Sequence, residues 1–162
     1  MRVIKMDEIR IIVAGTRSFD NFYVLTRNID NYLYKLVLDK VITDKEMIKF
    51  ISGTAKGADQ LGEQYAKVCG CEIVRFFANW DKYGKSAGYI RNKEMAKYAA
   101  EKTGVLFAFW DGESKGTKHM IDLAYQYGLE VHIINYTEDS FGNDDLKILK
   151  PENTDMEDKT YE

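Results

Sequence analysis

Three short loops carry the residue types that bind phosphate in proteins: glycines, hydroxyl side chains and basic side chains. They cover residues 14–20, 52–59 and 110–117. Each loop follows an apolar, β-rich run and precedes a segment with helical periodicity. Glycine lets the backbone approach a ligand closely, and the free N–H groups at the start of a helix favour an anion. The loops therefore predict a site for a phosphate-bearing ligand.

The first loop supplies two hydroxyl groups and a planar cation. Thr16 and Ser18 carry the hydroxyls, and Arg17 carries a guanidinium whose geometry suits phosphate. The dinucleotide fingerprint G-x-G-x-x-G is absent, because Arg17 stands where its second glycine belongs. We predict that Gly15, Thr16, Arg17 and Ser18 contact the ligand; an ordinary strand–helix turn is the alternative interpretation.

The second loop combines small residues with the expected start of a helix. A Walker A loop is excluded, because Lys56 precedes Gly57 whereas the lysine of that motif follows its glycine. We expect Asp59 either to cap the helix or to accept a hydrogen bond from a ribose hydroxyl. The contacts predicted for this loop are Ser52, Gly53, Thr54, Ala55, Gly57 and Asp59.

The third loop is again spaced by glycines at a helix start. Two such helix starts in one parallel sheet are expected to face a single crevice. The contacts predicted for this loop are Asp111, Gly112, Ser114, Gly116 and Thr117.

Arg91 and Asn92 complete the set of predicted ligand contacts. They end a long polar and aromatic stretch, residues 79–92, and stand near the expected start of a helix. The helix dipole disfavours an arginine there, which indicates a compensating partner. That partner is either a ligand phosphate or an internal carboxylate such as Asp59 or Asp111.

The elements that must position these loops alternate along the chain. Apolar β-rich runs cover residues 9–14, 47–51, 72–77, 105–110 and 131–136, and helical periodicity marks residues 22–36, 58–68, 91–98 and 120–127. Such alternation predicts a Rossmann-like α/β three-layer sandwich with a mostly parallel sheet of about five strands. Ligands bind such sheets at the carboxyl ends of the strands, where the three loops lie.

Several single residues carry further structural expectations. Gly70, Gly104 and Gly128 are expected to close three helices in the left-handed conformation. Trp80 and Trp110 are expected to pack in the core or at its rim rather than to stack on a base.

Composition narrows the class of protein. The chain has 162 residues, of which 45% are apolar and 30% charged, and it is expected to form one domain over residues 1–136. It contains no apolar run of membrane-spanning length and no apolar signal-peptide core, so we expect a cytoplasmic protein without a membrane partner. Cys69 and Cys71 lack nearby histidines, and no metal site is predicted.

The charge is divided unevenly along the chain. Residues 137–162 carry a net charge of −6 and are expected to form an acidic, partly disordered tail, whereas residues 1–136 carry +3. This small positive charge does not predict duplex DNA as a partner.

Taken together, the motifs resemble those of the YspA-like, cpYpsA-related SLOG family. They are GTRSF (15–19), SGTAKGAD (52–59), WxxYGKxAGxxRNxxM (80–95) and WDGxSxGT (110–117). The wider superfamily includes the cytokinin-activating "Lonely guy" phosphoribohydrolases and the DNA-processing protein DprA. The resemblance implies a Rossmann-like fold, a pocket for nucleotides or nucleotide-derived ligands, and a homodimer. It implies no other cofactor.

The comparison with the phosphoribohydrolases points to a missing acid. Their motif P-G-G-x-G-T-x-x-E resembles the segment that contains Gly116 and Thr117, but Met120 stands at the position of the catalytic glutamate. A methionine cannot transfer a proton. The resemblance therefore favours a nucleotide-binding sensor or carrier over a typical phosphoribohydrolase. Two alternatives are a hydrolase with a relocated acid, for which Asp111, Glu113 and Glu94 are candidates, and a DprA-like module for single-stranded DNA.

Overall fold

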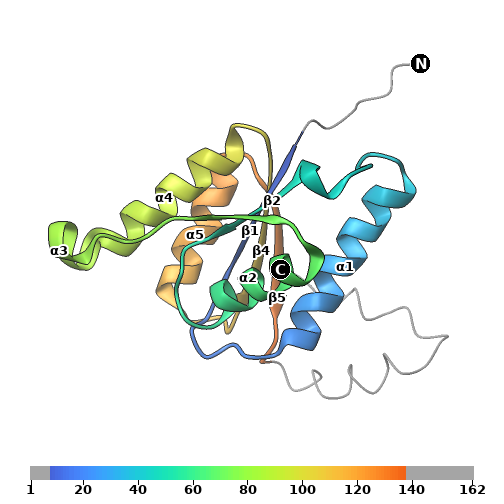
Figure 1. The fold of residues 1–162 in the computed structure, drawn as a ribbon. Helices are drawn as coiled ribbons and strands as arrows, with labels where there is room; N and C mark the ends of the chain where they lie inside the picture. Colours follow the sequence, from blue (N-terminus) through green and yellow to red (C-terminus); the bar gives the residue numbers. More distant parts are fainter. Residues whose placement is uncertain (1–7, 138–162) are drawn as a thin grey trace.

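A computed structural model describes residues 8–137 of the chain, so the predicted acidic tail lies outside the described residues except for Thr137. Five strands form one sheet in which all neighbours are parallel, in the order β3-β2-β1-β4-β5 (Figure 1). The predicted α/β sandwich is confirmed. The strands are β1 (Ile9–Gly15), β2 (Ile48–Ser52), β3 (Glu72–Arg75), β4 (Thr103–Trp110) and β5 (Glu130–Asn135).

Helices connect the strands and cover both faces of the sheet. They are α1 (Phe22–Leu38), α2 (Ala58–Cys69), α3 (Trp80–Tyr83), α4 (Ala87–Ala100) and α5 (Lys115–Gln126), with short 3-10 turns at Lys45–Met47 and Gly84–Ser86. Helices α1 and α2 cover one face, and α4 and α5 cover the other, whereas α3 lies at the outer end of α4, away from the sheet (Figure 1).

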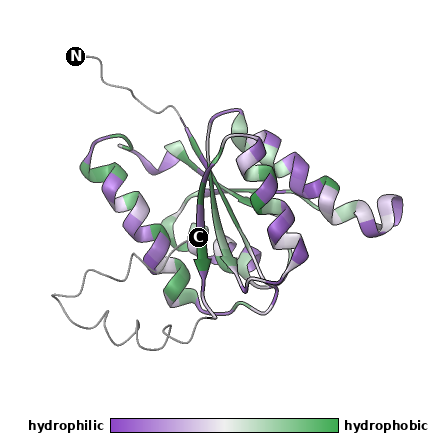
Figure 2. Cartoon of the chain, turned by 180° about the vertical axis from the view of Figure 1, so that it is seen from behind, coloured by the Kyte–Doolittle hydropathy of each residue, from purple (hydrophilic) through white to green (hydrophobic). Residues whose placement is uncertain are grey.

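Alternation along β1 divides the core into two layers. Ile11 and Val13 pack with α1 and α2, whereas Ile12 and Ala14 pack with α4 and α5. Successive side chains of a strand point to opposite faces, so a nearly continuous apolar strand fills both layers. Figure 2 shows the apolar residues gathered on the strands and the polar residues on the outer sides of the helices.

The helix ends agree with the predicted glycine caps at two of three positions. Gly70 and Gly128 have φ angles of 73° and 76°, in the left-handed region. The prediction for Gly104 was wrong, because this residue lies inside β4, opposite Arg10 of β1. A Cβ atom there would come within 2.8 Å of the Ala99 carbonyl oxygen. Gly104 therefore allows α4 to end close against the sheet.

The strand order creates a crevice at the carboxyl edge of the sheet. The chain passes from β1 to β2 on one side and enters β4 on the other side of β1. The loops after β1 and β4 therefore diverge, which is the usual place for a ligand in an open parallel sheet. Among residues 8–137, no helix has the combined length and apolarity needed to cross a membrane.

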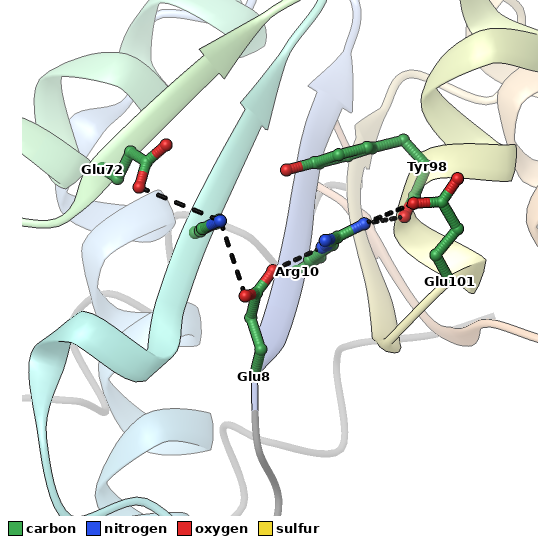
Figure 3. Close-up of polar contacts among 6 residues, drawn as sticks. Glu8, Arg10, Glu72, Tyr98 and Glu101 are labelled. Carbon is green, nitrogen blue, oxygen red and sulfur yellow. Dashed lines mark hydrogen bonds and ion pairs between the residues drawn. The ribbon is translucent and has the colours of Figure 1, made fainter.

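The amino edge of the sheet holds a charged network (Figure 3). The Arg10 guanidinium donates to Glu8 Oε2 at 2.5 Å, to the Tyr98 carbonyl oxygen at 2.6 Å and to Glu101 Oε1 at 3.1 Å. It also lies 3.8 Å from the centre of the Tyr98 ring, and Lys49 pairs with Glu8 at 3.4 Å. This network ties the first strand to the end of α4.

We expect the substitution Arg10→Lys to lower the free energy of unfolding by about 1.5 kcal/mol, because an ammonium cannot reproduce the forked set of charge-assisted hydrogen bonds. The side chain of Arg10 is 9% exposed, whereas that of its partner Glu101 is 65% exposed. The control Glu101→Gln should therefore change stability by less than about 0.5 kcal/mol. Urea denaturation measures the free energy of unfolding of both variants. Equal decreases in the two variants would contradict the view that the buried arginine supplies most of the stabilisation.

Candidate ligand-binding site

A small cavity, here called the central pocket, opens at the carboxyl ends of β1 and β4 and holds about 100 Å³. Four segments that are distant in the sequence meet there: the loops after β1, β2 and β4, and the first half of α4. Its lining residues are Ala14, Gly15, Arg17, Ala55, Asp59, Arg91, Asn92, Met95, Ser114, Gly116, Thr117 and Met120.

A second cavity of about 450 Å³, here called the outer pocket, adjoins the central one. The two share Arg17, Ala55 and Arg91. The lining residues of the outer pocket are Arg17, Gly53, Thr54, Ala55, Lys56, Phe77, Ala78, Trp80 and Arg91. The site therefore consists of a narrow polar end and a wider end with aromatic side chains.

Asp59 is the buried carboxylate of the central pocket, with 5% of its surface exposed. One of the two expectations, that Asp59 caps α2, was wrong. The N-cap residue of this helix is Gly57, and Asp59 is the second residue of the helix. Its Oδ2 atom instead accepts the N–H of Ala55 at 3.2 Å. Burial raises the pKa of Asp59 to about 6, although the Ala55 N–H and the charge of Arg91 act in the opposite direction.

Arg91 reaches the site from the second turn of α4, one turn later than expected, because the helix begins at Ala87. It donates to the carbonyl oxygen of Gly53 and, through Nε, to Asn92 Oδ1 at 3.2 Å. Burial lowers the pKa of Arg91, the charge of Asp59 raises it, and the charge of Arg17 lowers it further. Arg91 therefore has an internal carboxylate nearby, which was one of the two partners expected for it.

The lining of the central pocket carries more positive than negative charge. Arg17 is exposed at the mouth of both pockets, and its charge acts on Arg91. Asp59 is the one carboxylate among the lining residues of the two pockets. The two guanidinium groups carry one more unit of charge than the single buried carboxylate neutralises, which favours the binding of an anion.

Two helices begin at the central pocket, as the loop pattern predicted. Ser114 caps α5, since its hydroxyl accepts the N–H of Thr117 at 3.4 Å. At the start of α2, Gly57 has a φ angle of 85°, and a Cβ atom there would lie 2.4 Å from the Thr16 carbonyl oxygen. Gly57 thus packs the start of α2 against the loop after β1 rather than opening it to a ligand.

Thr54 has an unusual backbone conformation for a β-branched residue. Its φ angle is 62°, a region that such side chains rarely adopt. Two short-range bonds hold it there: its N–H donates to Ser52 Oγ at 3.0 Å, and its hydroxyl donates to the Gly53 carbonyl oxygen at 2.6 Å. Strain of this kind is concentrated at binding sites, and Thr54 lines the outer pocket.

Several residues predicted to contact the ligand instead hold the loops in place. The Thr16 hydroxyl accepts the N–H of Asp111 at 3.1 Å, which joins the loops after β1 and β4. Asp111 accepts the N–H groups of Glu113 and Ser114, both at 2.8 Å. These bonds outweigh the opposing effect of burial and keep the pKa of Asp111 below its usual value. The predicted contacts that line neither pocket are Thr16, Ser18, Ser52, Gly57, Asp111 and Gly112.

None of the three candidate acids lines the central pocket. Asp111 is engaged in its own turn, Glu113 faces a groove on the outer side of α5, and Glu94 lies exposed on α4. Met120 does line the central pocket and is buried there. The side chain at the position of the phosphoribohydrolase glutamate is therefore apolar.

Two aromatic residues of the outer pocket, Trp80 and Phe77, were not among the predicted ligand contacts, and Trp80 had been expected to pack in the core or at its rim. Trp80 is 51% exposed and Phe77 is 70% exposed. The expectation of packing holds for Trp110, which packs against the core layer beneath α4 and α5 and whose indole N–H donates to the Ser114 carbonyl oxygen at 3.0 Å. The motif at residues 80–95 could have indicated a role for Trp80, because the same motif contains Arg91.

Comparison with known proteins agrees with the motifs. Residues 9–83 match the model of the YspA, cpYpsA-related SLOG family. The chain is also 27% identical to the Gene 61 protein of Mycobacterium phage D29 over 127 residues, which cover 75% of this chain and 93% of the phage protein. No solved structure matches significantly. The resemblance inferred from the motifs is thus confirmed over residues 9–83, which match the model of the YspA, cpYpsA-related SLOG family.

Proposed function

We propose that this protein binds a nucleotide, or another ligand that contains ribose phosphate, as a sensor or carrier. The observation that carries the proposal is the convergence of Arg17 and Arg91 on a pocket at which α5 begins. Guanidinium groups and helix N-termini both favour phosphate. The match of residues 9–83 to the SLOG family supports ligands related to nucleotides in general.

The sizes of the two pockets suggest how the ligand divides between them. A cavity of about 100 Å³ is below the usual range of roughly 300–1,000 Å³ for small-molecule sites, but it suits a phosphate group. The outer pocket, of about 450 Å³, has room for a sugar and a base. There the exposed ring of Trp80 offers a surface for stacking. The Asp59 carboxylate, ionised above about pH 6, lines the central pocket and can accept a hydrogen bond from a hydroxyl of a ribose attached to the phosphate.

Thermal unfolding with a matched set of compounds tests the proposal. At about a hundred times its dissociation constant, a ligand stabilises the native state by roughly 2.7 kcal/mol, which raises the Tm of a domain of this size by about 5–10 °C. We expect such a shift with AMP or ribose 5-phosphate and none with adenosine at the same concentration. Equal shifts with AMP and adenosine would contradict a phosphate-centred site, and no shift with any nucleotide would refute the proposal.

A second candidate function is hydrolysis of the N-glycosidic bond of a nucleoside monophosphate. The observation that favours it is Asp59, a buried carboxylate in the central pocket whose pKa of about 6 suits proton transfer near neutral pH. In that reaction water would add to C1′ of the ribose, and the base would leave with a proton. The binding function predicts no free base from AMP. Base release that disappears in Asp59→Asn would favour the hydrolase.

A further inference from the structure

A chain of hydrogen bonds leads from the outer surface of α5 to Arg91 in the central pocket. His119 Nδ1 lies 3.3 Å from Asn92 Nδ2, and Asn92 Nδ2 also lies 3.4 Å from the Gly116 carbonyl oxygen. On the other side of the amide, Asn92 Oδ1 accepts the Nε–H of Arg91. Arg91 in turn donates to the Gly53 carbonyl oxygen.

The chemistry of the neighbours allows one orientation of the Asn92 amide. The Gly116 carbonyl oxygen can only accept, and the Arg91 Nε–H can only donate. Asn92 must therefore direct its NH₂ group towards Gly116 and its oxygen towards Arg91. The NH₂ group then also faces His119 Nδ1, which must be the acceptor. This assigns the proton of the neutral imidazole to Nε2.

We propose that His119 is a positioning residue of the ligand site: its unprotonated Nδ1 holds the Asn92 amide in the orientation that directs Arg91 into the central pocket. The proposal goes beyond the contacts predicted from the motifs, because His119 lines neither pocket of the site. The effect of His119 on ligand binding rests on the proposed function.

Protonation of His119 would place two N–H groups opposite each other. If the Asn92 amide turned over to accept from His119, its NH₂ group would face Arg91 Nε–H and its oxygen would face the Gly116 carbonyl. Either arrangement loses at least one hydrogen bond of the chain. Asn92 is buried, so few water molecules can replace the lost bond. The orientation of Arg91 is therefore linked to the protonation state of a histidine outside the pocket.

The surroundings of His119 favour the neutral imidazole. Burial lowers the pKa of His119, and the charge of Asp122 on the same helix partly opposes this effect. The ring of Tyr89, from α4, packs against the imidazole with 4.5 Å between the ring centres. The charged residues that share the groove with His119 are Glu113, Lys115, Lys118 and Asp122.

The first test is an NMR titration of the ligand-free protein between about pH 5 and pH 8. We expect the Asn92 side-chain amide and the Arg91 Nε–H resonances to shift with the same midpoint as the ring protons of His119. Asp59 titrates near pH 6 and also acts on Arg91, so the variant His119→Asn is required. Its side-chain oxygen keeps an acceptor near the position of Nδ1 but does not titrate. A shift of Asn92 that persists in this variant would overturn the proposal.

The second test measures AMP affinity at about pH 7.5, where His119 is neutral. His119→Phe keeps a ring against Tyr89 but removes the acceptor, and we expect about three- to tenfold weaker binding. His119→Asn should stay within about twofold of the wild type. His132→Phe, at the other histidine of the chain, is the matched control and should leave the affinity unchanged.

The outcomes separate the two proposals. Equal affinity of His119→Phe and the wild type would overturn the role of His119. If the wild type did not bind AMP, the proposed function would fail as stated, while the NMR titration would still decide whether His119 orients Asn92.

Discussion

Replacing Arg91 by alanine is expected to weaken AMP binding by about ten- to a hundredfold. The substitution would remove the proposed charge-assisted hydrogen bond to phosphate, a kind of contact that contributes about 1.5–3 kcal/mol. It also leaves the buried Asp59 carboxylate without the nearby positive charge that lowers its pKa. An anion would then meet an uncompensated carboxylate. Isothermal titration calorimetry at constant pH measures the loss.

Two further variants show whether the effect belongs to the ligand. Arg91→Lys keeps the charge but loses the planar fork, so it should recover part of the affinity. Arg75→Ala is the matched control, because Arg75 pairs with Glu63 at 2.8 Å and lines neither pocket. Some loss of Tm is expected for Arg91→Ala, since Arg91 also donates to Gly53. A large loss of Tm with unchanged affinity would identify Arg91 as a structural residue.

Replacing Gly116 by alanine should remove most of the thermal shift that AMP produces while leaving the free protein at least as stable. Gly116 lies in the first turn of α5, and a Cβ atom there would meet no atom within 4 Å. The new methyl group would therefore project into open space at the central pocket, where we expect the phosphate. Alanine also favours a helix over glycine by about 0.5–1 kcal/mol.

The control for this variant is Gln126→Ala, an exposed position at the other end of the same helix. It introduces the same residue type far from the pocket and should keep the full shift of about 5–10 °C. If Gly116→Ala kept the full shift of Tm with AMP, the phosphate would not bind beside Gly116, and the loop that follows β1 would be the next position to examine. Comparison of melting curves with and without AMP is sufficient for both variants.

The fold could be predicted from the sequence because local patterns and tertiary structure agree. The run at residues 9–14 is almost continuously apolar and becomes a central strand, with side chains in both layers of the core. The glycines at positions 70 and 128 end helices as expected. Gly104 shows the limit of such reasoning. A glycine that ends a helix and one that lets a helix pack against a strand look alike in a sequence.

The candidate site was predictable in its loops but not in the role of each residue. The pattern of glycines and hydroxyls identified three loops that meet at the central pocket. It could not show that the Thr16 hydroxyl accepts the N–H of Asp111, because these two residues are 95 positions apart in the chain. Nor could it reveal the environment of Asp59, whose raised pKa arises from burial in the folded chain.

The charged network around Arg10 and the candidate ligand site lie at opposite edges of the sheet. Arg10 and its partners join elements at the amino edge, whereas the two pockets open at the carboxyl edge. The aromatic side chains of the outer pocket are largely exposed and contribute little to the core. Trp80 and Phe77 can therefore be substituted at little cost in stability, so the lining of the outer pocket can vary while the scaffold is retained. A library of variants randomised at these two positions would show which ligands the outer pocket can be changed to accept.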